Sequence, residues 1–169
     1  MRTTAAQGLG FAGLMLSGAI FGFFYAWVCS TMWGLDAADP RVAIAAMQAM
    51  NASVRNAVFA PAFFGTPFVL LAAGAAAWLA SKPGAALAFG LGGLAYLAGG
   101  LFLTMAVNVP MNEALAQLAI PANVDEASAI WQGYSPRWQL FNTLRTVVSA
   151  GALAAAGLGL FLLGRPARR

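Results

Sequence analysis

The sequence predicts an all-α membrane protein: a four-helix transmembrane bundle with short amphipathic helices in its two outward-facing segments. Of the 169 residues, 61% are hydrophobic and only 8% are charged, whereas soluble domains carry about 25% charged residues. The apolar residues form four stretches, each long enough to cross about 30 Å of hydrocarbon. Length and composition indicate a single four-span domain over residues 1–169.

The first predicted span covers residues 8–34, because no charged residue lies between Arg2 and Asp36. A signal peptide is the alternative interpretation, but its apolar region would be shorter and would end at a small-residue cleavage site. This stretch ends near Trp27 and Trp33 instead, as is typical of an interfacial aromatic belt.

The other three predicted spans cover residues 57–80, 85–107 and 146–164. Pro61 and Pro67 lie in the second of them, and they predict a kink or a locally opened backbone near its outer end. The fourth span would be about 28 Å long at 1.5 Å per residue, which is enough to cross the bilayer.

The distribution of Lys and Arg predicts the orientation. The two chain ends and the turn after the second span hold five basic residues and no acid: Arg2, Lys82, Arg165, Arg168 and Arg169. The other two segments hold all five acids and four basic residues: Arg41, Arg55, Arg137 and Arg145. Basic loops favour the cytoplasmic side. We therefore expect an integral protein of the bacterial inner (plasma) membrane with both termini in the cytoplasm.

The first outward-facing segment carries signals for a helix. Asp39 is a good N-cap, and Pro40 suits the first helical position. Ile44, Met47, Val54 and Val58 follow at helical spacing, with Asn51 on the same stripe. The pattern predicts a helix of roughly 16 residues that runs from Pro40 toward the second span.

The second outward-facing segment carries three such signals. Pro110 begins a helical pattern through Met111, Leu115 and Leu118. Asn123 and Glu126 have the spacing of a capping box. Ser135-Pro136 is expected to start a helix that continues into the fourth span.

Small residues are frequent in the spans. Gly18 and Gly22 have GxxxG spacing, and the third span contains Gly92, Gly93, Gly99 and Gly100. Such residues let helix backbones approach closely in lipid. Packing within one bundle is the first interpretation, and a homo-oligomer held by the same faces is the second.

Polar side chains are scarce and gather toward the outer face. Trp131, Tyr134, Trp138, Asn142 and Arg145 share one helical stripe. Two further groups lie at the same level: Asn51 with Arg55, and Asn108 with Asn112 and Glu113. Because unpartnered polar groups are costly near hydrocarbon, we expect these side chains to face one another.

One interpretation of this cluster is a ligand cavity. Trp131, Tyr134 and Trp138, with Asn51 and Arg55, would bind a flat apolar molecule. Arg145 or Arg55 would stabilise developing negative charge, with help from Asn108, Asn112 and Asn142. Glu113 would accept a proton, and Asp36 is the second candidate for that role.

The other interpretation is structural. Glu113 would pair with Arg145 or Arg55, the asparagines would cap helix ends, and the aromatic residues would anchor the interface. Taken singly, Trp27, Trp33 and Trp78 are best explained as such anchors.

Composition excludes several kinds of site. The chain has no histidine, which excludes His-ligated haem, zinc, copper and facial-triad iron. Glu113 and Asp36 are too few ligands for a closed carboxylate metal site, so we expect no metal. The net charge of +4 does not indicate nucleic-acid binding, because the basic residues are scattered or lie at the ends of the spans. The lone Cys29 is expected to behave as a small apolar side chain.

Several motifs, in order and spacing, resemble the anthrone-oxygenase-like family of small four-helix membrane proteins. They are Gly22-Phe23-Phe24-Tyr25-Ala26-Trp27, Met47-Gln48-Ala49-Met50-Asn51, Asn108-Val109-Pro110-Met111-Asn112, then Trp131, Tyr134, Trp138 and Asn142-Thr143-Leu144-Arg145-Thr146. Relatives often carry Met-Pro-Gly-Leu in place of Met32-Trp33-Gly34-Leu35, Asn-Pro in place of Asn56-Ala57, and a histidine in place of Thr143. If that histidine is a family base or ligand, this chain lacks it.

The resemblance implies oxidation of polyketide anthrones to anthraquinones without a cofactor. An anthrone has an acidic CH₂ group, and its enolate can react with O₂ directly. The protein would then supply a base, charge stabilisation and a dry aromatic pocket. We therefore hold two hypotheses: an oxygenase acting on a flat lipophilic substrate, and a non-catalytic tetraspan protein that binds a lipid or a partner protein. A transporter or channel ranks third, because no span carries a charge at mid-membrane.

Overall fold

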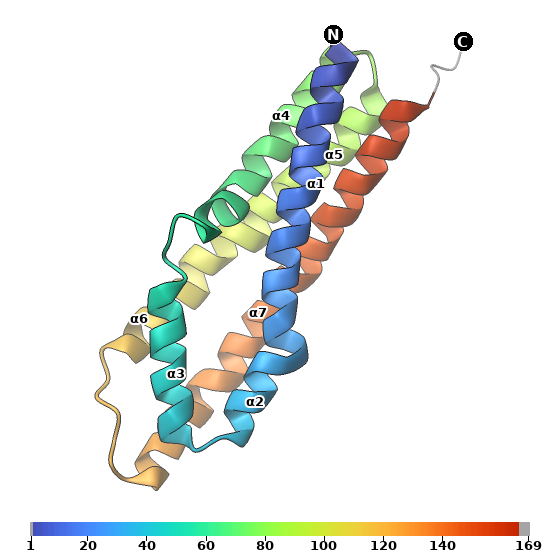
Figure 1. Ribbon diagram of the computed structural model, residues 1–169. Helices are drawn as coiled ribbons and strands as arrows, with labels where there is room; N and C mark the ends of the chain where they lie inside the picture. The colour runs from blue at the N-terminus through green and yellow to red at the C-terminus, as the bar shows by residue number, and fades with distance from the viewer. Residues whose placement is uncertain (1, 166–169) are drawn as a thin grey trace.

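The computed structural model describes residues 2–165, and this part of the chain contains helices and turns but no strand (Figure 1). Four helical stretches are long and apolar enough to cross a membrane: Thr3–Ala37, Pro61–Leu79, Pro83–Ala116 and Val124–Gly164. The predicted all-α, four-span fold class is confirmed. Arg168 and Arg169, on which part of the predicted orientation depends, lie outside the described residues.

The long stretches are made of several segments, some of them π-helical and labelled η. In chain order they are α1 (Arg2–Ala26), η1 (Trp27–Thr31), α2 (Met32–Ala37), α3 (Pro40–Ser53), η2 (Pro61–Gly65), α4 (Thr66–Leu79), α5 (Pro83–Tyr96), η3 (Leu97–Phe102), η4 (Thr104–Asn108), α6 (Val109–Ala116) and α7 (Val124–Gly164). A π-helical turn widens the hydrogen-bond ladder by one residue and is frequent at functional sites.

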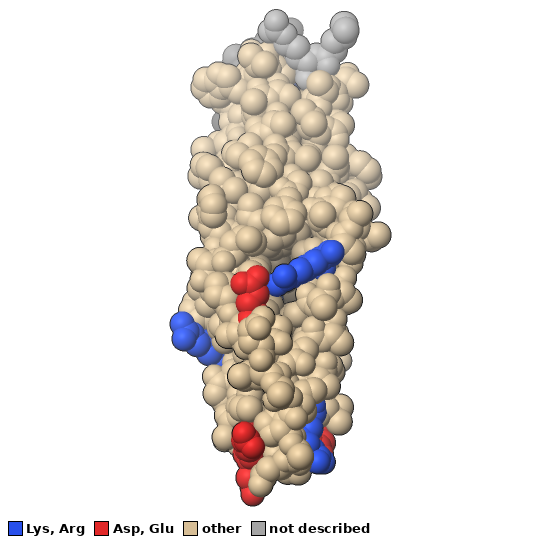
Figure 2. All heavy atoms as spheres, turned by 90° about the vertical axis from the view of Figure 1, so that its left-hand side faces the viewer, with Lys and Arg blue, Asp and Glu red and all other residues tan. Residues whose placement is uncertain are grey.

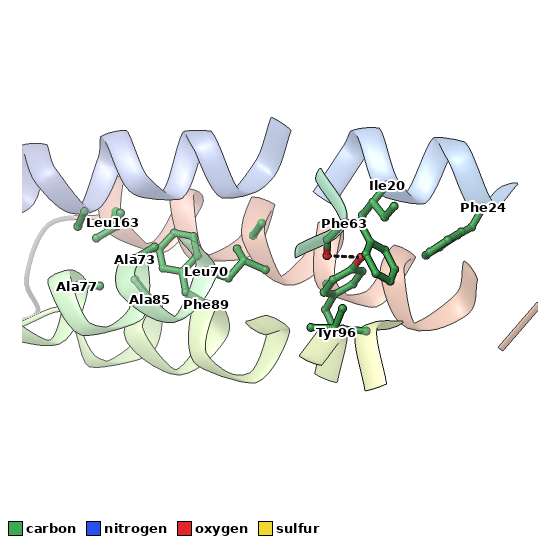
Figure 3. Packing of buried hydrophobic residues seen from close by; sticks show 14 residues of the cluster. Ile20, Phe24, Phe63, Leu70, Ala73, Ala77, Ala85, Phe89, Tyr96 and Leu163 are labelled. Carbon is green, nitrogen blue, oxygen red and sulfur yellow. Dashed lines mark hydrogen bonds between the residues drawn. The ribbon is translucent and has the colours of Figure 1, made fainter. Parts of the chain in front are cut away.

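Helices α1, α4, α5 and α7 form the bundle around the main apolar core (Figure 3). Glycines let these helices approach closely. A Cβ atom on Gly74 would lie 3.1 Å from the carbonyl oxygen of Ala86, and one on Gly92 would lie 2.9 Å from Cβ of Ala155. Close approach of this kind is how helices associate in lipid. Gly92 of the third span therefore packs within the chain.

Three helical stretches continue well beyond the bundle: Thr3–Ala37, Pro83–Ala116 and Val124–Gly164. α7 has 41 residues, which corresponds to about 62 Å, or about twice the thickness of the hydrocarbon core. Helices α2 and α3 pack beside its N-terminal half around a second apolar cluster, which includes Met32, Ile44 and Met47. We call α2, α3, α6 and the N-terminal half of α7 the polar end. On the face shown in Figure 2, the charged atoms of the described residues extend from the middle of the molecule to the tip of the polar end.

Pro61 and Pro67 flank a π-helical turn, as expected for a locally opened backbone. Pro67 has no N–H to donate to the carbonyl of Phe63, its partner in an α-helix. The hydroxyl of Tyr96 donates to that carbonyl oxygen instead, at 3.1 Å (Figure 3). Because Tyr96 is fully buried, this bond joins the second and third spans inside the core.

Two of the three predicted helix caps of the outer segments form, those at Asp39 and Asn123. Oδ1 of Asp39 accepts a hydrogen bond from the backbone N–H of Arg41 at 2.9 Å. The Arg41 side chain also pairs with Asp39 at 2.6 Å and lowers the pKa of that carboxyl to about 2. Oδ1 of Asn123 accepts from the N–H groups of Asp125 and Glu126 at 2.7 and 3.2 Å. These caps fix where α3 and α7 begin.

Other expectations for these segments are confirmed only in part. Ser135-Pro136 lies inside α7 and starts no helix, because α7 already begins after the Asn123 cap and continues through Pro136. The Ser135 hydroxyl donates to Oδ1 of Asp36 at 2.7 Å. The helix predicted from Pro110 does form, as α6 (Val109–Ala116) with Pro110 in its first turn, where a missing N–H is tolerated. It continues the third span without a break. Val58 is 89% exposed beyond the end of α3.

Candidate functional site

A cavity of about 580 Å³ lies where the bundle meets the polar end. Its volume is in the range of pockets that hold small organic ligands. The π-helical segments η1, η2 and η4 all contribute to its lining, together with α1, α3, α6, α7 and the turn at residues 54–58. The local widening of three helices thus coincides with the cavity.

Seven aromatic rings line the cavity. They belong to Phe23, Phe24, Trp27, Phe59, Phe63, Phe64 and Trp138. Trp27 is only 8% exposed and its ring lies 5.0 Å from that of Trp138. The expectation that Trp27 is an interfacial anchor is therefore wrong, because the ring points into the protein. Trp33 and Trp78 are 65% and 68% exposed, as anchors would be.

Arg145 is the buried charge of the cavity, with only 4% of its surface exposed. Its Nε donates to Oδ1 of Asn142 at 3.0 Å, and its Nη1 donates to Oγ1 of Thr104 at 3.3 Å. Within residues 2–165, no Asp or Glu pairs with Arg145, and its Nη2 has no hydrogen-bond partner. A buried cation without a counter-ion is costly, so this arrangement favours an anion in the cavity.

Two rings flank the guanidinium group of Arg145. Its Cζ lies 4.4 Å from the ring centre of Phe24 and 5.0 Å from that of Trp138. Cation–π attraction offsets part of the desolvation cost and also holds the planar group in place. The cavity therefore offers a fixed positive charge between aromatic surfaces.

Asn142 positions Arg145 from one side. Its Nδ2 donates to the backbone carbonyl of Phe24 at 3.1 Å, which ties α7 to α1 just before η1. An amide that donates through Nδ2 must accept through Oδ1, and Oδ1 is the atom that binds Nε of Arg145. Asn142 does not line the cavity, so it acts through the arginine.

Asn112 is held at the centre of the polar wall. Its Oδ1 accepts from the Tyr134 hydroxyl at 2.7 Å and from Nε1 of Trp138 at 2.9 Å. Its Nδ2 donates to Oδ1 of Asn51 at 3.0 Å. Nδ2 of Asn51 is then enclosed without a partner among the described residues. An unpaired buried donor is costly and is typical of a site that a ligand or a water completes.

Glu113 lies at the rim of the cavity. It forms an ion pair with Arg55 at 3.2 Å, and both side chains are more than half exposed. Such exposed pairs contribute about 1 kcal/mol or less. The carboxylate is therefore available to exchange partners.

The remaining predicted residues lie outside the lining. Asn108 is fully buried, and its Nδ2 donates weakly to the carbonyl of Trp138 at 3.4 Å. The indole N–H of Trp131 donates to Asp36 at 2.9 Å, on the side of α7 that faces α2. Tyr134 contributes through its bond to Asn112.

The cavity therefore brings together six of the predicted site residues: Asn51, Arg55, Asn112, Glu113, Trp138 and Arg145. The sequence reasoning missed Thr104 and the phenylalanines of the first and second spans. They carry no signal that distinguishes them from ordinary apolar residues of a span. Among residues 2–165, no three Asp, Glu, Cys or His side chains are grouped in a way that could hold a metal ion.

Thr143 stands at the position where the resemblance led us to expect a histidine. It is exposed on α7 and is not among the residues that line the cavity. A histidine at this position would point away from Arg145 and would add no group to the cavity.

The family model described as anthrone oxygenase matches residues 56–155. This match covers more than half of the chain, and it includes α4 to α6 and most of α7. The protein is thus a four-span helical protein of membrane type, and it belongs to the anthrone oxygenase family. No curated protein and no solved structure matches the chain.

Proposed function

We propose that this protein is a membrane-embedded, cofactor-independent oxygenase that oxidises a flat, lipophilic, anthrone-type substrate in the cavity. The observation that carries the proposal is Arg145, a buried cation without a carboxylate partner among the described residues. Its position between aromatic rings suits an aromatic ligand that develops negative charge. Membership of the anthrone oxygenase family supports the same chemistry.

In this mechanism the aromatic walls hold the ring system and exclude water. Glu113, at the cavity rim, accepts a proton from the CH₂ group of the substrate. The resulting enolate oxygen lies against Arg145, whose charge stabilises it in the low-dielectric cavity. The enolate transfers electrons to O₂. One oxygen atom becomes the new ketone, and the other leaves as water with the two hydrogens lost from the substrate carbon.

Oxygen uptake with anthrone by the purified protein in detergent tests the proposal. Anthrone oxidises spontaneously, so the rate is taken as the excess over buffer. Arg145→Ala and Glu113→Gln should each abolish most of that excess. Arg137→Ala is the matched control, because Arg137 is exposed on the same helix outside the cavity. Wild-type rates in the folded Arg145→Ala and Glu113→Gln proteins would contradict the proposal.

A non-catalytic, lipid-binding or partner-binding protein is the second candidate. The ion pair between Arg55 and Glu113 favours it, because Glu113, the proposed base, is already paired with Arg55. In that case an aromatic or lipid ligand would bind the cavity, and the protein would give no oxygen uptake above buffer.

We further propose that both termini face the cytoplasm. Lys82 and Arg165 meet at the end opposite the polar end, where the Lys82 ammonium donates to the Arg165 carbonyl. The acids of the described residues all belong to the other end. Labelling of single cysteines at positions 82 and 125 in intact cells, in a Cys29→Ser background, tests this orientation. Labelling of position 125 alone by an impermeant reagent is expected.

A further inference from the structure

The second and third spans pack closely on one side of the hydrogen bond between Tyr96 and Phe63, and both border the cavity on the other side. A Cβ on Gly93 would lie 3.1 Å from the carbonyl oxygen of Pro67. One turn closer to the polar end, the Tyr96 hydroxyl binds the carbonyl of Phe63 (Figure 3). Beyond this bond, the two spans border the cavity through η2 and η4. The Tyr96–Phe63 bond therefore marks the floor of a gap between the two helices.

The cavity reaches the surface along two edges. The apolar edge is formed by Phe64 of η2 and Met105 of η4, which are 48% and 46% exposed. Both belong to stretches that are apolar enough to cross a membrane. No hydrogen bond or ion pair between described residues joins these two side chains.

The second edge is polar, and an ion pair and a hydrogen bond connect its two sides. Arg55 pairs with Glu113 at 3.2 Å, and Asn112 donates to Asn51 at 3.0 Å. These same four residues also line an outer groove of about 500 Å³. They therefore form a partition between the cavity and the groove.

From these two edges we infer that the cavity takes its ligand from the hydrocarbon phase, through the gap between Phe64 and Met105. The ligand is a membrane-dissolved flat aromatic molecule. Its acidic, oxygen-bearing edge enters first and reaches Arg145, while any alkyl substituent stays between Phe64 and Met105 in contact with lipid. This inference rests on the proposed function, because it assumes that the cavity binds an aromatic ligand.

The physical reason is a difference in cost between the two routes. Passage at the apolar edge displaces only the flexible thioether chain of Met105 and the ring of Phe64, which packs edge-on against Phe63 at 4.8 Å between ring centres. A molecule that is already dissolved in hydrocarbon gains nothing by first entering water, since transfer of its apolar surface to water is unfavourable by roughly 25 cal/mol per Å². Passage at the polar edge would also require breaking the partition.

A reversible cross-link tests the route. Phe64→Cys and Met105→Cys are combined in a Cys29→Ser background, and the two thiols are joined by a flexible, reducible bifunctional reagent. The probe is 1,8-dihydroxyanthraquinone in phosphatidylcholine vesicles, and its binding is followed by quenching of Trp27 and Trp138, which line the cavity. The matched control joins Ala52→Cys to Ala116→Cys, both exposed residues of the outer groove.

We expect the Phe64–Met105 cross-link to slow quenching at least tenfold, and reduction to restore the rate in the same sample. The Ala52–Ala116 cross-link should leave the rate unchanged. An unchanged rate with the first cross-link, or slowing by the second, would overturn the inference and leave the proposed function standing. Failure of the uncross-linked wild type to bind the probe would instead refute the proposed function, and this inference with it.

A single substitution gives a second measurement that needs no cross-link. Phe64→Trp places a new fluorophore at the apolar edge, where lipids carrying brominated chains should quench it more than they quench wild-type protein. Absence of quenching by brominated lipid would show that this edge does not face hydrocarbon, and the inference would fail.

Discussion

The indole Nε1 of Trp138 donates to Oδ1 of Asn112 across 2.9 Å. Because an indole N–H can only donate, this bond fixes which end of the Asn112 amide is the acceptor. The donor end must then point at Asn51, as it does at 3.0 Å. The same Trp138 ring also flanks the guanidinium group of Arg145. One side chain therefore orients the polar wall and packs against the cation.

Replacing Trp138 by Phe should separate these two roles. The ring against Arg145 is kept and the donor to Asn112 is lost, so we expect binding of 1,8-dihydroxyanthraquinone to weaken by roughly tenfold or less, as for one hydrogen bond. Trp131→Phe is the control, since it removes an indole bond to Asp36 outside the cavity. Equal affinities for the two variants would show that the orientation of Asn112 does not matter for binding.

We expect Arg145 to serve the proposed function and to lower the stability of the folded protein. Replacing a buried, unpaired charge by an apolar side chain of similar length is often neutral or stabilising. We expect Arg145→Met to melt in detergent at the wild-type temperature or above it. Arg145→Met melting far below wild type would indicate that Arg145 is mainly a structural link to Asn142 and Thr104.

The Tyr96 hydroxyl should be needed because Pro67 supplies no N–H. Tyr96→Phe leaves the Phe63 carbonyl buried and unpaired, which should destabilise the protein by about 1–3 kcal/mol. Pro67→Ala restores an N–H in the second span. In that background we expect Tyr96→Phe to cost less, and a double-mutant cycle of thermal unfolding in detergent measures the coupling. Strictly additive effects would rule out the proposed exchange of donors.

The Asp39–Arg41 pair gives a pH dependence at the start of α3. Arg41 lowers the pKa of Asp39 to about 2 in the folded state, below its ordinary value of about 4. The stabilisation is therefore complete above about pH 4 and is lost as the pH falls toward 2. Asp39→Asn keeps a capping side chain but cannot titrate. Its melting temperature should fall less than that of the wild type between pH 5 and 2, and parallel curves would contradict this assignment.

The sequence predicted the bundle because each membrane helix can be predicted from its own residues. A long uncharged stretch indicates a span, and a capping residue such as Asp39 or Asn123 indicates where a helix begins. The prediction failed at Ser135-Pro136 because α7 begins at the Asn123 cap and continues through Pro136, and because the Ser135 hydroxyl binds Asp36, which is 99 residues away in sequence. A local capping rule cannot include such a partner.

The sequence predicted only part of the candidate site, because only some of its residues carry a local signal. Arg145, Asn112 and Glu113 stand out because polar groups are rare in an apolar chain. Phe24 and Thr104, which contact Arg145, resemble the other apolar and small residues of the spans. Only the folded helices bring them to the guanidinium group, and the π-helical turns that widen the cavity have no sequence signature of their own.

The central claim is that Arg145 binds the acidic edge of a flat aromatic ligand inside the cavity. An equilibrium titration of 1,8-dihydroxyanthraquinone against wild type, Arg145→Met and Arg137→Ala, read by tryptophan quenching, tests it most directly. Loss of a charged hydrogen bond of about 1.5–3 kcal/mol predicts a dissociation constant raised by at least about tenfold for Arg145→Met alone. Equal dissociation constants for all three folded proteins would contradict the claim.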